Sequence, residues 1–320
     1  MPELRKDYFT NKFVITNSER LKRPSDFRRT PKTSIDKKCF ICSNFNRPGQ
    51  VGILESRGGL VAEKRSESNK EDEFFKHIPA FGYHYIISES SHELRFDKLA
   101  VPRLSEMLIS LQEKGRSLYS KKGIEYISIY LDYGIEEGTG TSHPAFELLT
   151  LPEIPPIIAE ELNAVNRSMY DLGICPMCRV LSVETGGPRQ ILSTTHFLAF
   201  APWAATHSFE FWICPKAHQT TFLRISESDI YDLALILRST LGGLVSALGR
   251  VQFNLVFHNS PQEKSNGDLH WHIEVYPQIK RWAGMETGMN IFINDVSPED
   301  CAELLGKATR KQLADLVGVT

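Results

Sequence analysis

The sequence predicts an α+β protein made of two tandem repeats, in which antiparallel sheets pack against helices. Three observations lead to this fold class. The chain has 320 residues, enough for two domains or for one duplicated domain. Two cysteine pairs and four histidines recur in the same order in the two halves. Each half also contains an amphipathic helical segment that is followed by a strand-like segment.

The composition is that of a globular protein with little net charge. Hydrophobic residues make up 41% of the chain and charged residues 24%, with a formal net charge of −2. This balance argues against bulk electrostatic binding to nucleic acid or to an acidic membrane. The apolar runs are short for a transmembrane helix, and the N-terminus lacks the hydrophobic region of a signal peptide. We expect a cytoplasmic protein with no nucleic-acid and no membrane partner.

Four of the six cysteines form two C-x-x-C pairs, and each pair is followed by two spaced histidines. In a reducing cytosol such pairs indicate metal binding or redox chemistry. Corresponding residues of the two sets lie 136 residues apart for the cysteines and 126 and 127 residues apart for the histidines. This nearly constant phase indicates an internal duplication. The sets are Cys39, Cys42, His92 and His143, and Cys175, Cys178, His218 and His270.

The elements of each half follow the same order. Apolar strand-like runs precede His92 and His218, and an amphipathic helix and a second strand come next. Prolines at 152, 155 and 156 mark the joint, which divides the chain into 1–155 and 156–320. The expected strands are 83–88, 124–134, 209–214 and 251–260, the expected helices are 96–120 and 226–250, and a linking helix is expected at 160–173.

The spacing of the two sets predicts one zinc site per half, or two Zn²⁺ per chain. Zinc favours four tetrahedral ligands, and thiolate with imidazole is a common structural combination. A C-x-x-C turn brings two sulfurs to one ion, and histidines on neighbouring strands can complete the site. The alternatives are buried free cysteines beside unrelated histidines, or a redox pair, which would leave the histidines unexplained.

Several longer motifs carry a family resemblance. KRPSDF at 22–27, the CFIC and CPMC pairs, LHWHIEVYPQ at 269–278 and SPED at 297–300 are similar to segments of the galactose-1-phosphate uridylyltransferase family, a branch of the histidine-triad superfamily. The resemblance covers nearly the whole chain. It implies two tandem histidine-triad-like repeats, each with a packed helix, and a possible homodimer.

The resemblance also implies a mechanism, and the chain departs from it. In the family, a histidine attacks the α-phosphorus of a nucleotide sugar, and an acceptor then takes the nucleotide from that histidine. The family motif His-Pro-His-x-Gln reads His143-Pro144-Ala145-Phe146-Glu147 here. A methyl group cannot attack phosphorus, and a carboxylate repels phosphate instead of donating a hydrogen bond. Asp132 stands where the family usually has an asparagine. We therefore expect a divergent member with Glu147 as a candidate catalytic residue.

The second repeat keeps a histidine at the equivalent position, His272. Strand alternation puts His270, His272 and Glu274 on one face. Two interpretations remain open. His272 is either a structural or pocket residue, or the working site has moved to the second repeat, with His272 as nucleophile or acid–base group and Glu274 beside it.

Further candidates follow from the resemblance alone. They match family positions near the nucleotide, the sugar phosphate or a partner subunit, and the alternative for several of them is an ordinary surface loop. The candidate substrate-binding residues are Arg23, Asp132, Asn254, His258, Lys280, Met285 and Glu286.

Three functions are compatible with the sequence. The first is a zinc-containing nucleotidyltransferase or phosphorylase acting on a nucleotide sugar or sugar phosphate with an altered centre. The second is the same scaffold repurposed for zinc or acid–base chemistry on a small metabolite. The third is an inactive homologue that binds a nucleotide or a protein.

Overall fold

The computed structural model describes residues 3–10, 13–16, 39–45, 47, 49–56, 60–63, 79–91, 95–134, 143–249, 251–261 and 269–318. Two sequence-predicted site residues, Arg23 and His92, lie outside these ranges. Their assigned roles therefore remain predictions.

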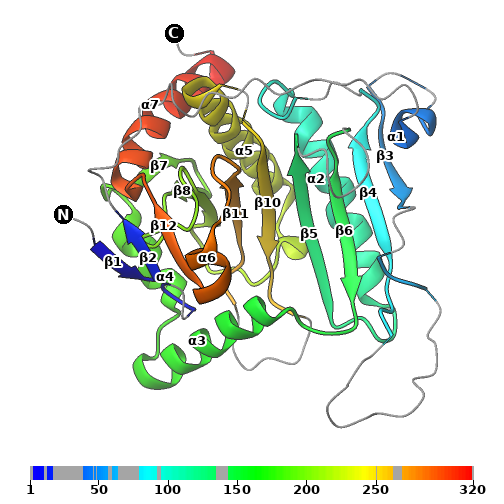
Figure 1. Cartoon of the computed structure of the whole chain (residues 1–320). Coiled ribbons are helices and arrows are strands. Elements are labelled where there is room, and N and C mark those ends of the chain that lie inside the picture. Colours follow the sequence, from blue (N-terminus) through cyan, green and yellow to red (C-terminus); the bar gives the residue numbers. More distant parts are fainter. Residues whose placement is uncertain are drawn as a thin grey trace.

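One sheet of nine strands runs through both halves of the molecule (Figure 1). Its order is β3-β4-β6-β5-β10-β11-β9-β8-β7, and all neighbouring strands are antiparallel. The strands are β3 (Val51–Glu55), β4 (His84–Glu89), β5 (Tyr126–Tyr133), β6 (Phe146–Leu151), β7 (Gln190–Ser193), β8 (Phe197–Phe200), β9 (Phe211–Pro215), β10 (Phe253–His258) and β11 (His272–Pro277).

The two halves meet where β5 pairs with β10, and Tyr130 lies opposite Val256 at this seam. Tyr130 also lies opposite Glu147 on β6, while Val256 lies opposite Glu274 on β11. The registers therefore relate the halves by an approximate two-fold axis that passes between Tyr130 and Val256. Glu147 and Glu274 occupy equivalent positions.

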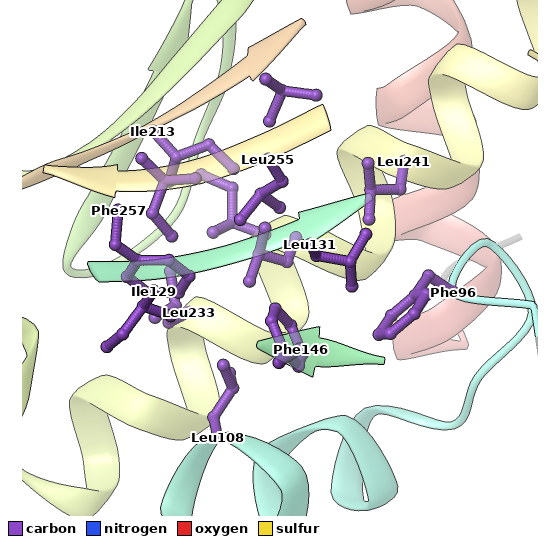
Figure 2. Packing of buried hydrophobic residues seen from close by; sticks show 14 of the residues in the cluster. Phe96, Leu108, Ile129, Leu131, Phe146, Ile213, Leu233, Leu241, Leu255 and Phe257 are labelled. Atoms are coloured by element: carbon purple, nitrogen blue, oxygen red, sulfur yellow. The ribbon is translucent and has the colours of Figure 1, made fainter. Parts of the chain in front are cut away.

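Helices α2 (Val101–Tyr119), α5 (Glu227–Leu248) and α7 (Pro298–Val317) cover one face of this sheet (Figure 1). Their apolar side chains and those of the strands form the main core. Helix α5 is long and apolar enough to cross a membrane by length and composition, but most of it is buried, as expected for a core helix. Figure 2 shows Leu108, Leu233 and Leu241 of the helices packed near Ile129, Leu131, Phe146, Leu255 and Phe257 of the strands.

The opposite face carries smaller apolar clusters with polar side chains between them. Helix α1 (Phe40–Ser43) covers its first-half edge. Helix α4 (Pro176–Glu184) packs on β8 and β9, and α3 (Pro156–Leu172) packs against Tyr126 and Leu269. This second face carries Glu147 of the first half and His272 and Glu274 of the second half.

The N-terminal segment packs on the second half of the chain. Strands β1 (Glu3–Lys6) and β2 (Phe13–Thr16) form a small sheet with β12 (Ile291–Asn294), which follows helix α6 (Gly284–Met289). An ion-pair network fixes this arrangement: Arg5 pairs with Glu299 at 3.1 Å, and Tyr8 donates a hydrogen bond to Glu184 at 3.0 Å.

The α+β fold class with antiparallel strands and packed helices is confirmed. The amphipathic segments form α2 and α5, and the linking segment forms α3. No sequence pattern predicted that the strands of both halves would join in one sheet. They do so because β5 and β10 satisfy each other's backbone hydrogen bonds at what would otherwise be two open edges.

Candidate functional site

The second cysteine–histidine set comes together as the spacing predicts. Cys175 and Cys178 lie at the start of α4, His218 follows β9 and His270 precedes β11. Their four ligand atoms all lie within 4.8 Å of one another. The Sγ atom of Cys178 is 3.3 Å from Nδ1 of His218 and 3.4 Å from Nδ1 of His270. Two sulfurs and two imidazole nitrogens at this separation fit a tetrahedral Zn²⁺.

His270 is oriented for this role by the main chain. Its Nε2 atom lies 2.8 Å from the carbonyl oxygen of Pro215 and therefore carries the proton, which leaves the Nδ1 lone pair facing the cysteines. Burial, with smaller contributions from the neighbouring histidines, lowers the pKa of His270 to about 4. The ring is therefore neutral near pH 7, as a metal ligand must be.

The first set has the same local geometry. Nδ1 of His143 lies 3.6 Å from Sγ of Cys39 and 3.3 Å from Sγ of Cys42, and Nε2 of His143 lies 2.8 Å from the carbonyl oxygen of Glu89. These three residues can hold a metal ion. Glu89 precedes His92 by three residues, as Pro215 precedes His218. His92 stays the sequence-predicted fourth ligand.

A third group of possible ligands lies beside the second set. His258 on β10 is opposite His272 on β11, and Nδ1 of His258 lies 2.8 Å from Oε1 of Glu161 on α3. Nε2 of His272 lies 3.2 Å from Oε1 of Glu274. All four side chains are buried, and their ligand atoms lie within 4.8 Å of one another, so the group is able to hold a cation. Without a cation, the negative charges of the two carboxylates can be balanced by protonated imidazoles in ion pairs.

His272 is closed off from solvent. Its side chain is 0% exposed and its ring stacks on Trp212 with 5.1 Å between the ring centres. Its Nδ1 atom lies 3.2 Å from the carbonyl oxygen of His270, so both nitrogens are engaged. Tyr8 and Phe9 of the N-terminal segment pack on the same tryptophan.

The equivalent region of the first half is organised around Glu147. Oε2 of Glu147 lies 2.7 Å from Nε2 of His84 on β4 and accepts a hydrogen bond of 2.8 Å from the hydroxyl of Tyr130 on β5. The Glu147 side chain is buried. Ala145 lies two residues earlier and packs with Cys39, Ile86 and their neighbours. A histidine–carboxylate–tyrosine group thus occupies the part of the sheet where the family motif places the glutamine.

Asp132 and Asn254 lie opposite each other across the seam, and the Asn254 amide donates a hydrogen bond of 2.5 Å to Asp132. Burial and the charge of Glu147 raise the pKa of Asp132, although the hydrogen bond from Asn254 offsets part of this shift. Asp132, Asn254 and Tyr130 are only half-buried. The centre of the polar face is therefore its more accessible part.

The remaining candidates lie on or near helix α6. Glu286 is buried and its carboxylate accepts a hydrogen bond of 3.0 Å from the Ala283 amide, which caps the helix. Nζ of Lys280 lies 3.5 Å from Asp295, and Met285 is exposed. Among the described residues, no hydrogen bond or ion pair joins these three residues to Glu147 or His272.

Sequence reasoning missed His84, Tyr130 and Glu161. His84 and Tyr130 reach Glu147 from two neighbouring strands, and only the strand register reveals that contact. Glu161 was assigned only to a linking helix. The available signal was the alternation along β5, which puts Ser128, Tyr130 and Asp132 on one face.

Comparisons with known proteins agree with the motifs. No family model matches the chain. ADP-glucose phosphorylase of Arabidopsis thaliana is 27% identical over 327 residues, which span 95% of this chain and 92% of that protein. Galactose-1-phosphate uridylyltransferase of Thermotoga maritima is 26% identical and covers 95% of this chain and 98% of its own length.

The solved structures give the same answer. An ADP-glucose phosphorylase from Arabidopsis thaliana with bound ADP-glucose has a TM-score of 0.81 at 26% identity, over 96% of this chain and 98% of that one. A structure described as uridylyltransferase has a TM-score of 0.80 at 25% identity, over 97% and 99%. Sequence and fold agree over almost the full length, and both support the resemblance of the chain to the galactose-1-phosphate uridylyltransferase family and its similarity to ADP-glucose phosphorylase.

Proposed function

We propose that the chain is a zinc-containing enzyme that breaks a phosphoanhydride bond of a nucleotide sugar, by chemistry related to nucleotidyl transfer and phosphorolysis. The observation that carries this proposal is the row of polar side chains on one face of the shared sheet, at positions matching the family's motif. The similarity to a structure that contains ADP-glucose supports a nucleotide sugar as the ligand.

The metal in this proposal is structural. The second set offers four protein ligands, which would fill a tetrahedral shell and leave no position for substrate. Zn²⁺ there would fix α4 to the ends of β9 and β11. The first set, with His92 as its fourth ligand, would fix the segment 39–45 to β6 in the same way. The chemistry would then fall to side chains beside the metal sites.

We assign turnover to the first half of the sheet. Both ring nitrogens of His272 are engaged in hydrogen bonds, and a nucleophile needs a free lone pair. Tyr130, Asp132 and Asn254 at the seam are half-buried and lie next to Glu147. In this assignment Asp132 and Asn254 contact the substrate, and His272 with Glu274 supports the second half.

The test is binding and turnover of ADP-glucose and UDP-glucose by the zinc-loaded full chain. Calorimetry measures binding, and chromatography of the nucleotides, with and without inorganic phosphate, measures turnover. Tyr130→Ala should weaken binding or turnover strongly. Glu303→Gln, an exposed change on α7, is the matched control and should have no effect. Absence of binding to either nucleotide sugar would contradict the proposed function.

A second candidate function is acid–base or metal-assisted chemistry on a small metabolite that is not a nucleotide. The buried group of Glu161, His258, His272 and Glu274 favours it, because these side chains can bind a cation or exchange protons. Efficient turnover of a nucleotide sugar would exclude this candidate. Binding of a nucleotide sugar without any turnover would favour an inactive binding homologue instead.

A further inference from the structure

The carboxylate of Glu147 is contacted by two side chains, His84 and Tyr130, at one oxygen only. Nε2 of His84 lies 2.7 Å from Oε2, and the Tyr130 hydroxyl lies 2.8 Å from the same atom. In the described part of the chain, no hydrogen bond engages the other oxygen, Oε1. The side chain is 2% exposed. A fixed carboxylate with one oxygen unused is a suitable proton acceptor.

One ring nitrogen of His84 has no hydrogen-bond partner. Because Nε2 faces a carboxylate, it carries the proton in the neutral ring, and the lone pair is then on Nδ1. Nδ1 is buried and has no hydrogen-bond partner, and the residue is only 8% exposed. Buried polar nitrogens are nearly always paired with protein, water or ligand. A histidine oriented by a carboxylate, with its second nitrogen unpaired, is the arrangement that stores and returns a proton in many active sites.

The position of the family's nucleophilic histidine carries a methyl group in this chain. Ala145 precedes Glu147 by two residues on the same face, and its methyl group packs with Ile86 and Cys39. Position 145 therefore cannot form a nucleotidyl-enzyme bond. In our proposal the oxygen that attacks phosphorus comes from a second molecule.

We propose that Glu147, positioned by His84 and Tyr130, acts as a general base for water, so that the chain hydrolyses a nucleotide sugar in one direct displacement. This inference rests on the proposed function. The water oxygen bonds to the α-phosphorus while the α-phosphorus–oxygen bond to the sugar phosphate breaks. The water proton passes to Glu147, with His84 as its reservoir, and then to the departing phosphate oxygen. The products are a nucleoside monophosphate and a sugar 1-phosphate.

Charge favours water over phosphate as the attacking molecule. Glu147 and Asp132 bring two carboxylates close enough that one charge raises the pKa of the other, and Asn254 satisfies only one oxygen of Asp132. A phosphate dianion would have to enter beside this pair and the anionic diphosphate of the bound substrate, and all of these charges repel it, whereas neutral water is not repelled. The two carboxylates therefore disfavour attack by inorganic phosphate. They also provide a base that can take a proton from the attacking water.

The first experiment determines which product receives the oxygen atom of water. Zinc-loaded full chain is incubated with ADP-glucose in ¹⁸O-water, with and without inorganic phosphate. The expected products are AMP with one ¹⁸O atom and unlabelled glucose 1-phosphate, at a rate that phosphate does not raise. Intact-protein mass measured during turnover should show no adenylylated chain. Formation of ADP in phosphate, label in glucose 1-phosphate, or an adenylylated chain would each overturn the inference.

The second experiment separates chemistry from structure. Glu147→Gln keeps the shape and should lower kcat by about 100-fold or more, while the Kd for ADP-glucose stays within about 3-fold. His84→Gln should lower kcat less and leave KM unchanged, because it acts through Glu147. Equal kcat in wild type and Glu147→Gln would overturn the inference, with zinc content and melting temperature showing that the variants are folded. If ADP-glucose does not bind the wild-type chain, the proposed function fails; if it binds and yields ADP, only this inference fails.

Discussion

His143 and His270 use their ring nitrogens in the same way, although they lie in different halves of the chain. Each turns Nδ1 toward a cysteine pair, and each has Nε2 at 2.8 Å from a main-chain carbonyl oxygen. The two carbonyls belong to Glu89 and Pro215, at equivalent ends of β4 and β9. This agreement in orientation makes both sets suitable for the same ion.

Metal analysis should find about two zinc ions per purified chain, one for each set. Cys175→Ser removes one of four ligands, so the zinc content should fall to about one per chain and the melting temperature should drop. Mass spectrometry under native conditions measures the count. Cys214→Ala is the control, because Cys214 is a buried thiol outside both sets and its loss should leave the zinc content unchanged. Folded wild-type protein without metal would contradict the prediction.

Ala145→His, combined with Glu147→Gln, should restore a nucleophile at phosphorus. We expect the double variant to gain the mass of one nucleotidyl group when it is mixed with a nucleotide sugar, whereas the wild type gains none. Intact-protein mass spectrometry provides the measurement. Ala145→Asn with Glu147→Gln is a polar control that cannot form the adduct. Since Ala145 is packed against Ile86, the melting temperatures of both variants should be compared first. An adduct in the asparagine control would show that another residue reacts.

Gly243→Ala should destabilise the contact between α5 and α7. A Cβ atom at position 243 would lie 2.9 Å from both Cα and N of Thr309, and backbone atoms cannot move aside cheaply. We expect a loss of about 1–3 kcal/mol in the free energy of unfolding. Denaturant titration measures it. Gly288→Ala in α6 is the matched control, since no atom lies within 4 Å of the added Cβ, and its effect should be small. A loss of equal size in both variants would argue against the packing explanation.

Glu299 should contribute stability that is lost in acid. Burial raises its pKa, but hydrogen bonds from Arg189 and the backbone, together with the charge of Arg5, outweigh this effect and bring the pKa below its usual 4.5. A carboxylate with a depressed pKa stabilises the folded state at pH values above its unfolded pKa, and this contribution fades as the pH falls through the folded pKa. Thermal melts at pH 7 and in the pH 3–4 range should therefore differ less in Glu299→Gln than in wild type. Asp315→Asn, which lies exposed on the same helix, should behave like wild type.

The two cysteine–histidine sets and the order of helices and strands could be predicted from the sequence for a physical reason. A duplicated C-x-x-C with two histidines repeats a constraint on coordination, and helix and strand periodicities repeat with it, so two copies reinforce one interpretation. The contact between His84 and Glu147 was not readable, because it depends on the register between two strands that are separated by 57 residues in sequence (Glu89 to Phe146). The burial of His272 behind Trp212 also depends on how the N-terminal segment packs.

Some expectations stay predictions. Arg23 and His92 lie outside the described residues, and Lys280, Met285 and Glu286 lie on or near helix α6. The family roles of Arg23, Lys280, Met285 and Glu286 concern a partner subunit or a bound sugar phosphate, and neither follows from the packing of a single chain. Metal analysis of His92→Ala would test the predicted role of His92 as a zinc ligand.

The pairing of β5 with β10 has a consequence for any attempt to divide the protein. A fragment ending near residue 155 would leave the outer edge of β5 with its amide and carbonyl groups unpaired, and a fragment beginning near 156 would do the same to β10. Such open edges recruit strands from other molecules. Separately produced halves should therefore aggregate, or associate with each other when they are mixed. A single ancestral repeat would have had the same open edge, and pairing with a second copy of itself would have covered it.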